Sequence, residues 1–347
     1  MDSDPTGNKP TATRTGENPS SGILPPQVYR AGLPGYLKKL DEALRKGLAQ
    51  WRNLAWEDDV SRNNLDDEPF ENLPPPSELP PEMFNPGLIQ RCANLIGKQD
   101  LTEEITRDRF PIPAPEDRER YSVGYHGNYW LSGFQDFVKI CQVAEQRGVD
   151  IQSYLDFGCA SGRVVRHFCA QQNIGEIWAT DINARHIRWL CEFLPANVKP
   201  VANHSFPSLP IPDHSIDVIS AFSVFTHLDT FELGWLAELS RILKPGGFAY
   251  VTVHNEDTWR MLRDEIENPN NRLVSSMIQI DPDTPQKLKA EMPNTRLVYR
   301  FTDAGPYRAQ VFHSNQYLQQ FWGRFFNIKE IIPGHHVRQT VVVMTKK

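Results

Sequence analysis

The 347-residue sequence predicts an α/β fold: a seven-stranded, mostly parallel sheet with a C-terminal antiparallel hairpin, plus a helical N-terminal extension. Three observations predict it. From Ile151 onward, short apolar runs alternate with helical patterns, which is typical of parallel strands joined by helices. Glycines follow several of the apolar runs, where turns are expected. Two apolar runs near the C-terminus are separated only by residues 333–338, which indicates a hairpin.

The strands and helices follow from these runs. We expect strands near residues 152–157, 176–180, 198–202, 216–222, 247–253, 326–332 and 339–345. We expect helices near residues 162–172, 184–193, 229–243 and 315–325. Ser314 stands where the last of these helices needs an N-cap.

The part of the chain before the first strand has a different character. Residues 1–30 are rich in Pro, Ser, Thr, Asn and Gly and predict a disordered tail. Residues 31–120 predict a helical region interrupted by prolines, with helical spacing over 36–56 and 86–109. A further helix over 129–148 leads directly into the sheet.

Composition excludes several classes of protein. The net charge of −6 argues against a long nucleic-acid partner. The longest apolar run, residues 216–225, is too short to span a bilayer, and the first residues lack the pattern of a signal peptide. Five cysteines without Cys-x-x-Cys spacing favour reduced thiols. We therefore expect a cytoplasmic protein without a membrane span or a metal site, and the sequence predicts no particular oligomeric state.

The most informative stretch is Leu155-Asp156-Phe157-Gly158-Cys159-Ala160-Ser161-Gly162-Arg163, which predicts a strand, a tight glycine turn and the start of a helix. Glycine lacks a Cβ and tolerates positive φ, so a ligand can approach the backbone of such a turn closely. The helix start beyond it offers unpaired N–H groups to a polar ligand. The stretch therefore indicates a nucleotide site.

Further polar residues stand at the predicted strand ends. Asp181 ends the second strand, where an acid can accept hydrogen bonds from both ribose hydroxyls. Asn203 and His204 follow the third strand. The fourth strand is approached through Leu209-Pro210-Ile211-Pro212-Asp213 and the fifth through Leu243-Lys244-Pro245-Gly246-Gly247.

This succession resembles the class I S-adenosylmethionine-dependent methyltransferases. The match covers about residues 150–255, and the terminal hairpin extends it to 347. The resemblance implies a Rossmann-like domain over 121–347 with an insertion at about 255–312, and S-adenosyl-L-methionine as cofactor. Two residues depart from the family pattern: Ala160 replaces a glycine, and Asn203 stands where aspartate is frequent.

The resemblance also implies roles for single residues. The turn would pass beneath the methionine part and ribose of the cofactor, Asp156 would orient the turn or the cofactor ammonium, Asp181 would hold the ribose, and Ile182 would pack on the adenine. The expected cofactor-binding residues are Asp156, Gly158, Ala160, Gly162, Asp181, Ile182, Asn203, His204, Ala221 and Phe222. The aromatic segment 121–130 is a candidate cover for the cofactor, with an aromatic face toward the sulfonium.

The implied reaction is in-line attack on a methyl group, which mainly requires alignment and exclusion of water. A general base is needed only when the nucleophile keeps its proton, as a hydroxyl does. His227 and His254, at the ends of the fourth and fifth strands, are the candidate catalytic residues. Asp217 stands at the start of a strand and predicts a structural role.

The acceptor is the least determined part of the sequence. We expect a small-molecule or saccharide acceptor, methylated at oxygen, with residues 255–312 as a wall of its pocket. Arg300, Tyr307 and Arg308 could bind an anionic or hydroxyl-rich acceptor, but the sequence favours a solvated surface for them. N-methylation and a non-catalytic cofactor-binding module remain alternatives. An NAD-dependent oxidoreductase is disfavoured because the turn lacks Gly-x-Gly-x-x-Gly spacing, and an RNA methyltransferase because residues 222–225 lack an Asn/Asp-Pro-Pro-Tyr/Phe tetrapeptide.

Overall fold

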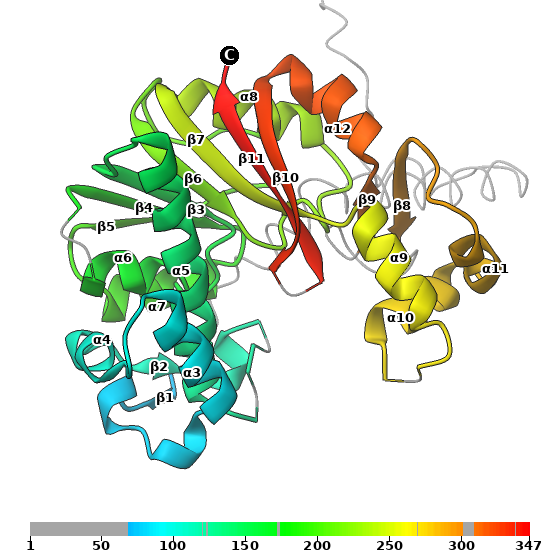
Figure 1. Ribbon diagram of the computed structural model, residues 1–347. Coiled ribbons are helices and arrows are strands. Elements are labelled where there is room, and N and C mark those ends of the chain that lie inside the picture. Colours follow the sequence, from blue (N-terminus) through cyan, green and yellow to red (C-terminus); the bar gives the residue numbers. More distant parts are fainter. Residues whose placement is uncertain are drawn as a thin grey trace, which may run out of the picture. The chain divides into compact units, whose positions relative to one another are not determined.

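The computed structural model describes residues 69–119, 121–122, 124–171, 174–268, 270–300, 309–336 and 338–347 (Figure 1). The predicted tail over 1–30 and the predicted helix over 36–56 lie outside these residues, as do Tyr307 and Arg308. Among the described residues, none of the helices combines the length and the apolar character that crossing a membrane requires.

A seven-stranded sheet forms the centre of the described part of the chain, in the order β10-β11-β7-β6-β3-β4-β5. The strands are β3 Ser153–Phe157, β4 Glu176–Asp181, β5 Val198–Ala202, β6 Ile216–Ala221, β7 Leu243–Val253, β10 Phe326–His336 and β11 Gln339–Lys346. β5, β4, β3, β6 and β7 are parallel, whereas β11 is antiparallel to β7 and to β10. The predicted sheet and its C-terminal hairpin are confirmed.

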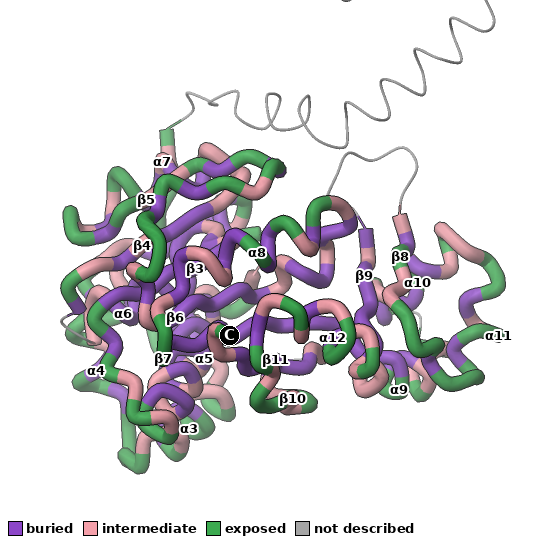
Figure 2. Tube along the Cα trace, turned by 90° about the horizontal axis from the view of Figure 1, so that it is seen from above, coloured by how far each residue is buried: buried purple, intermediate pink, exposed green. Residues whose placement is uncertain are grey.

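The last strand lies inside the sheet, between β7 and β10, and this position explains its composition. Val341 and Val343 belong to the hydrophobic core on one face, whereas Val342 and Met344 belong to the core on the other. Successive side chains of a strand point to opposite faces, so a strand covered on both sides reads as a continuous apolar run. Figure 2 shows that β3 in the same sheet is likewise buried along its length.

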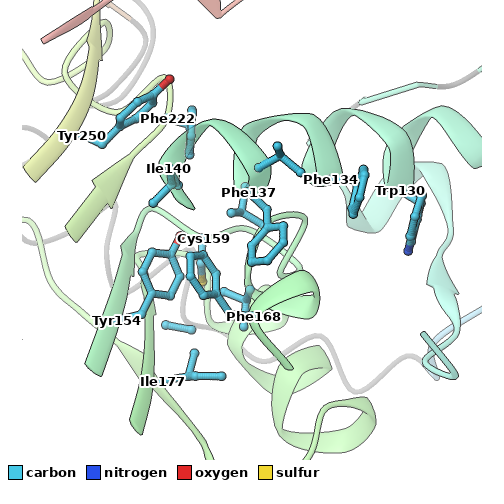
Figure 3. Close-up of a cluster of buried hydrophobic side chains, with 14 of the residues drawn as sticks. Trp130, Phe134, Phe137, Ile140, Tyr154, Cys159, Phe168, Ile177, Phe222 and Tyr250 are labelled. Atoms are coloured by element: carbon cyan, nitrogen blue, oxygen red, sulfur yellow. The ribbon is translucent and has the colours of Figure 1, made fainter. Parts of the chain in front are cut away.

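Helices cover both faces of the sheet. The first core includes side chains of α5 Gly127–Arg147, α6 Val165–Gln171 and α7 Ala184–Phe193, and the second includes those of α8 Glu232–Ile242, α12 Asn315–Phe321 and the short 3-10 helix η5 Trp322–Arg324. Figure 3 shows the first core, where Phe168 of α6 stacks on Tyr154 of β3 with ring centroids 3.7 Å apart. The predicted N-cap of α12 is confirmed, because the Ser314 side chain accepts a hydrogen bond from the Tyr317 N–H.

α5 packs closely against the segment that follows the glycine turn. A Cβ on Gly133 would lie 2.0 Å from the carbonyl oxygen of Arg163, so only glycine permits this approach. The helix ends at Gly148, which has a φ of +65° and caps it in the left-handed conformation. α5 is thereby held close to the glycine turn.

The N-terminal extension differs from the prediction in one respect. The expected helix over 86–109 is two helices, because Gly97, with a φ of +66°, ends the first of them. The elements of the extension are β1 Asn72–Leu73, η2 Pro76–Glu78, η3 Pro81–Met83, α3 Pro86–Leu95, α4 Thr102–Arg107, β2 Ile112–Pro113 and η4 Pro115–Asp117.

The insertion after β7 has a hydrophobic core of its own, which includes Trp259, Met277 and Phe312. It consists of the helices α9 Glu256–Asp264, α10 Arg272–Ile280 and α11 Thr284–Lys289 and the antiparallel pair β8 Arg296–Arg300 and β9 Ala309–His313 (Figure 1). β9 lies against the loops after β6 and β7, where the Val311 N–H bonds the Thr226 carbonyl and the His313 N–H bonds the His254 carbonyl. The insertion is therefore fixed to the end of the sheet where the site was predicted.

Candidate functional site

A cavity of about 1290 Å³ opens at the carboxyl ends of the parallel strands. Open α/β sheets bind ligands at this end. Eight of the twelve predicted site residues line the cavity: Asp156, Gly158, Ala160, Asp181, Ile182, Asn203, Phe222 and His227. The other four, Gly162, His204, Ala221 and His254, are not among its lining residues.

The glycine turn brings the backbone to the cavity. Gly158 has a φ of +78°, and a Cβ there would lie 2.3 Å from Cγ2 of Val224, so the position requires glycine. Gly162 also has a positive φ, but a Cβ there would lie nearest to the Leu194 side chain. Gly162 therefore contributes to the conformation of the turn without lining the cavity. Ala160 adopts a φ of +45°, and its N–H donates to the Asp181 carboxylate at 2.8 Å.

Asp181 connects the first two strand ends. Its carboxylate accepts hydrogen bonds from the N–H groups of Ala160 and Asn183, each at 2.8 Å. Burial alone would raise its pKa, but His186 and these hydrogen bonds hold the pKa of Asp181 below its usual value. A carboxylate has about four acceptor sites, so Asp181 retains capacity for two ribose hydroxyls.

Asp156 lies deeper in the same wall. Its Oδ1 accepts a hydrogen bond from the Ser220 hydroxyl at 2.8 Å. Burial raises the pKa of Asp156 to about 7. A positive charge nearby would lower this pKa and favour the ionised carboxylate. Such a shift is compatible with a position near the ammonium or sulfonium of the expected cofactor.

Asn203 is almost completely buried, yet the described residues offer its carbonyl oxygen no hydrogen-bond partner. Its amide nitrogen donates to the His204 carbonyl at 3.0 Å, which leaves the oxygen as the free end. A buried acceptor without a partner costs free energy unless a ligand supplies a donor. The adenine amino group is such a donor, so the departure from aspartate at this position is compatible with the cofactor.

The segment before α5 and the first turn of α5 contribute four residues to the cavity lining, and the sequence did not indicate the first two of them. Arg118, Glu119, Tyr121 and Tyr129 line the cavity. The Ser161 hydroxyl donates to the Asp117 carbonyl, so this segment lies directly on the glycine turn. Tyr121 and Tyr129 come from the aromatic segment that was expected to cover the cofactor, and the covering role stays a prediction.

Arg118 is the most unusual of these residues. Its side chain is fully buried, and Nε has no hydrogen-bond partner among the described residues. Among the described residues, the hydrogen bonds of its Nη groups go to His126, at the carbonyl oxygen and Nδ1, and the guanidinium lies over the Tyr129 ring at 5.7 Å. None of the ion pairs found in the described part of the chain gives this guanidinium a carboxylate. A buried cation without a counter-charge is costly, which points to an anionic ligand group in the cavity.

Another arginine positions the predicted residue Phe222. Arg163 is buried, forms an ion pair with Asp136 at 2.8 Å, and lies over the Phe222 ring at 5.4 Å. Asp136 also accepts from Nδ1 of His336 on the terminal hairpin, at 3.1 Å. The hairpin is thus connected through Asp136 and Arg163 to the part of the cavity that Phe222 lines.

Backbone strain is concentrated at this cavity. Among the described residues, six other than glycine have positive φ, and three of them, Glu119, Ala160 and Ser223, line the cavity. Such conformations cost free energy and cluster at functional sites.

Asp217 is at the opposite end of the sheet and binds Lys244 and Ser153, in agreement with its expected structural role.

The two candidate bases occupy different surroundings. His227 lines the cavity, and its Nδ1 lies 2.8 Å from the Ala309 carbonyl oxygen. His254 is buried beside Phe312, and burial lowers its pKa to about 3. Of the two candidate bases, His227 lines the cavity and His254 does not.

Comparison with known proteins identifies the family. A family described as a methyltransferase domain matches residues 114–327, which is more than half of the chain. Solved structures with a similar arrangement include S-adenosylmethionine-dependent methyltransferases from Clostridium acetobutylicum and from Methanosarcina mazei. The first is 11% identical, covers 63% of this chain and 91% of that chain, and has a TM-score of 0.40. The second is 17% identical, covers 59% and 96%, and has a TM-score of 0.41.

These structural scores are low, so the assignment rests on the domain match. That match begins four residues before Arg118 and ends just inside the terminal hairpin. It therefore includes the glycine turn, Asp181, Asn203 and the insertion. The chain belongs to the methyltransferase-domain family and is an S-adenosylmethionine-dependent methyltransferase.

Proposed function

We propose that this methyltransferase acts on a hydroxyl group of a small-molecule or saccharide acceptor, and that His227 is the general base. One observation carries the proposal. A carbonyl oxygen can only accept, so the contact between His227 Nδ1 and the Ala309 oxygen requires the proton on Nδ1. The lone pair of the neutral ring is then on Nε2. Burial lowers the pKa of His227, so the ring is neutral at physiological pH.

The cofactor supplies an electrophilic methyl group on its sulfonium when it is bound. We propose that Asp181 holds its ribose, that the Asn203 oxygen accepts from its adenine amino group, and that Arg118 pairs with its carboxylate. These assignments are supported by the free acceptor capacity of the first two residues and by the missing counter-charge of the third.

His227 would take the proton of the acceptor hydroxyl as that oxygen attacks the methyl carbon. A hydroxyl needs such a base because it keeps its proton at neutral pH. Phe222, Leu228 and Trp235 also line the cavity and would exclude water from the reacting atoms. An N-methyltransferase is the second candidate, and it is favoured only if amine acceptors react and His227 proves dispensable.

The test compares His227→Gln with His254→Gln, using a labelled methyl donor and paired acceptors that carry either a hydroxyl or an amine on the same skeleton. We expect His227→Gln to lower turnover of hydroxyl acceptors by roughly 100-fold or more, with unchanged cofactor affinity. In the native chain, kcat/KM should rise with pH, with a midpoint below the usual histidine pKa, and this rise should be absent in His227→Gln. Equal turnover in His227→Gln and the native chain would remove the base assignment.

A further inference from the structure

The wall of the cavity that the insertion contributes has a distinct chemistry. Four described residues of the insertion line the cavity: Gln279, Ile280, Arg300 and Gln310. Two of them carry amides, one carries a guanidinium, and none carries a carboxylate. The described residues on this side of the cavity are therefore rich in hydrogen-bond donors, and the one charged side chain among them is positive.

Arg300 is held in place by a buried acid. Its Nε lies 2.5 Å from Oδ2 of Asp229, whose side chain is only 1% exposed. Asp229 is not a lining residue, whereas Arg300 lines the cavity and is 38% exposed. The ion pair is made through Nε, so the two Nη groups are the part of the guanidinium that can bind a ligand. The carboxylate orients the guanidinium from behind.

The backbone beneath this pair is also fixed. Nη2 of Arg296 donates to the carbonyls of Leu228 and Asp229, at 2.8 and 2.9 Å. Arg296 in turn forms an ion pair with the buried Glu232 at 2.5 Å. His227 directly precedes the two anchored carbonyls. Arg300 and the proposed base are therefore attached to the same rigid loop.

We propose that the acceptor carries an anionic oxygen group, a carboxylate or a phosphate, and that Arg300 binds this group while the acceptor hydroxyl lies at His227. A guanidinium matches both groups through two parallel hydrogen bonds, which fixes orientation as well as position. The amides of Gln279 and Gln310 can donate to the same oxygens. The proposal rests on the methyl transfer proposed above and specifies its acceptor.

The test uses the full chain with saturating S-adenosylhomocysteine, so that only the acceptor end of the cavity is titrated. The probes are hydroxybenzoates, the corresponding hydroxybenzamides and hydroxyphenyl phosphates. Arg300→Gln removes the charge, Arg300→Lys keeps it without the planar fork, and Arg260→Gln, an exposed arginine on α9 of the same insertion, is the matched control. Binding is measured calorimetrically in the presence of S-adenosylhomocysteine, and methylation is measured in separate assays with a labelled donor and without S-adenosylhomocysteine.

We expect the carboxylate or phosphate probes to bind the native chain at least about tenfold more tightly than the amides. Arg300→Gln should abolish this preference and raise the KM of the charged probe more than it lowers kcat. Arg300→Lys should retain part of the preference, and Arg260→Gln should retain all of it. The carboxylate and phosphate arms distinguish the two sources of the charge. Equal binding of charged and neutral probes, or a preference that survives in Arg300→Gln, would overturn the proposal. If S-adenosylhomocysteine, titrated alone, still binds the native chain and the variants, such a result would leave the methyltransferase function unaffected.

Discussion

The two walls of the cavity are built in different ways. The cofactor wall consists of turns at the ends of consecutive strands, and its central contact, Ala160 N–H to Asp181, joins residues only 21 positions apart. The acceptor wall depends on the insertion, where Ala309 contacts His227 from 82 positions away. The first wall is formed by contacts between neighbouring strand ends, whereas the second requires that β9 of the insertion pack against the loops after β6 and β7. If the first wall binds the cofactor and the second the acceptor, as proposed, we expect mutations to change cofactor and acceptor affinity separately.

Arg118 gives the largest effect that separates the walls. Arg118→Met removes a buried cation that has no acidic partner, so affinity for S-adenosylhomocysteine should fall about 10- to 100-fold through the loss of a charge-assisted contact. 5′-Methylthioadenosine lacks the amino-acid part, and its affinity should not change. The unfolding free energy of the ligand-free chain should not fall, because no counter-charge is stranded.

Calorimetric titration and urea unfolding of the same variant check both expectations, with Arg109→Met, an exposed arginine of the extension, as control. Equal losses of affinity for both ligands would show that Arg118 supports the wall generally. A large loss of stability would mean that its contact with His126 outweighs the cost of the buried charge.

A smaller effect is expected at His254, where β9 of the insertion contacts the end of β7. Its pKa is about 3 in the folded chain, so between its usual pKa and that value the unfolded chain binds a proton that the folded chain does not. Acidification therefore lowers stability through this residue. In His254→Gln, the loss of unfolding free energy between pH 6 and pH 5 should be smaller by about 1 kcal/mol.

Urea unfolding at the two pH values measures this difference, with methyl transfer as a second readout. Turnover in His254→Gln should stay close to that of the native chain, because the residue does not line the cavity. If the pH dependence of stability is the same in the native chain and in His254→Gln, the pKa of His254 is the same in the folded and unfolded chains. The contact between the insertion and β7 would then open readily.

The difference between the walls also explains what could be predicted from the sequence. Strand ends were predictable because hydrophobic periodicity and glycine turns are local signals, so Asp156, Gly158, Asp181 and Asn203 were found and all line the cavity. Gly97 shows the limit of such signals: it follows the apolar stripe and ends α3, whereas the sequence predicted one helix up to residue 109.

Arg118 could not be found in this way. It stands in a proline-rich stretch that reads as a connection between helices, and nothing local shows that its side chain is buried or unpaired. The same holds for Asp229 beneath Arg300, since their ion pair joins a loop after β6 to a strand of the insertion. Residues defined by long-range contacts required the structure.

Calorimetric titration with S-adenosylmethionine and S-adenosylhomocysteine tests the central claim most directly. The native chain and Asp213→Ala, an exposed carboxylate far from the cavity lining, should bind both ligands with micromolar or tighter affinity. Asp181→Ala should lose at least about 100-fold, because the variant lacks the carboxylate that we propose to accept two hydrogen bonds from the ribose. Undiminished binding by Asp181→Ala, or no binding by the native chain, would contradict the account of the cofactor wall on which the acceptor proposals depend.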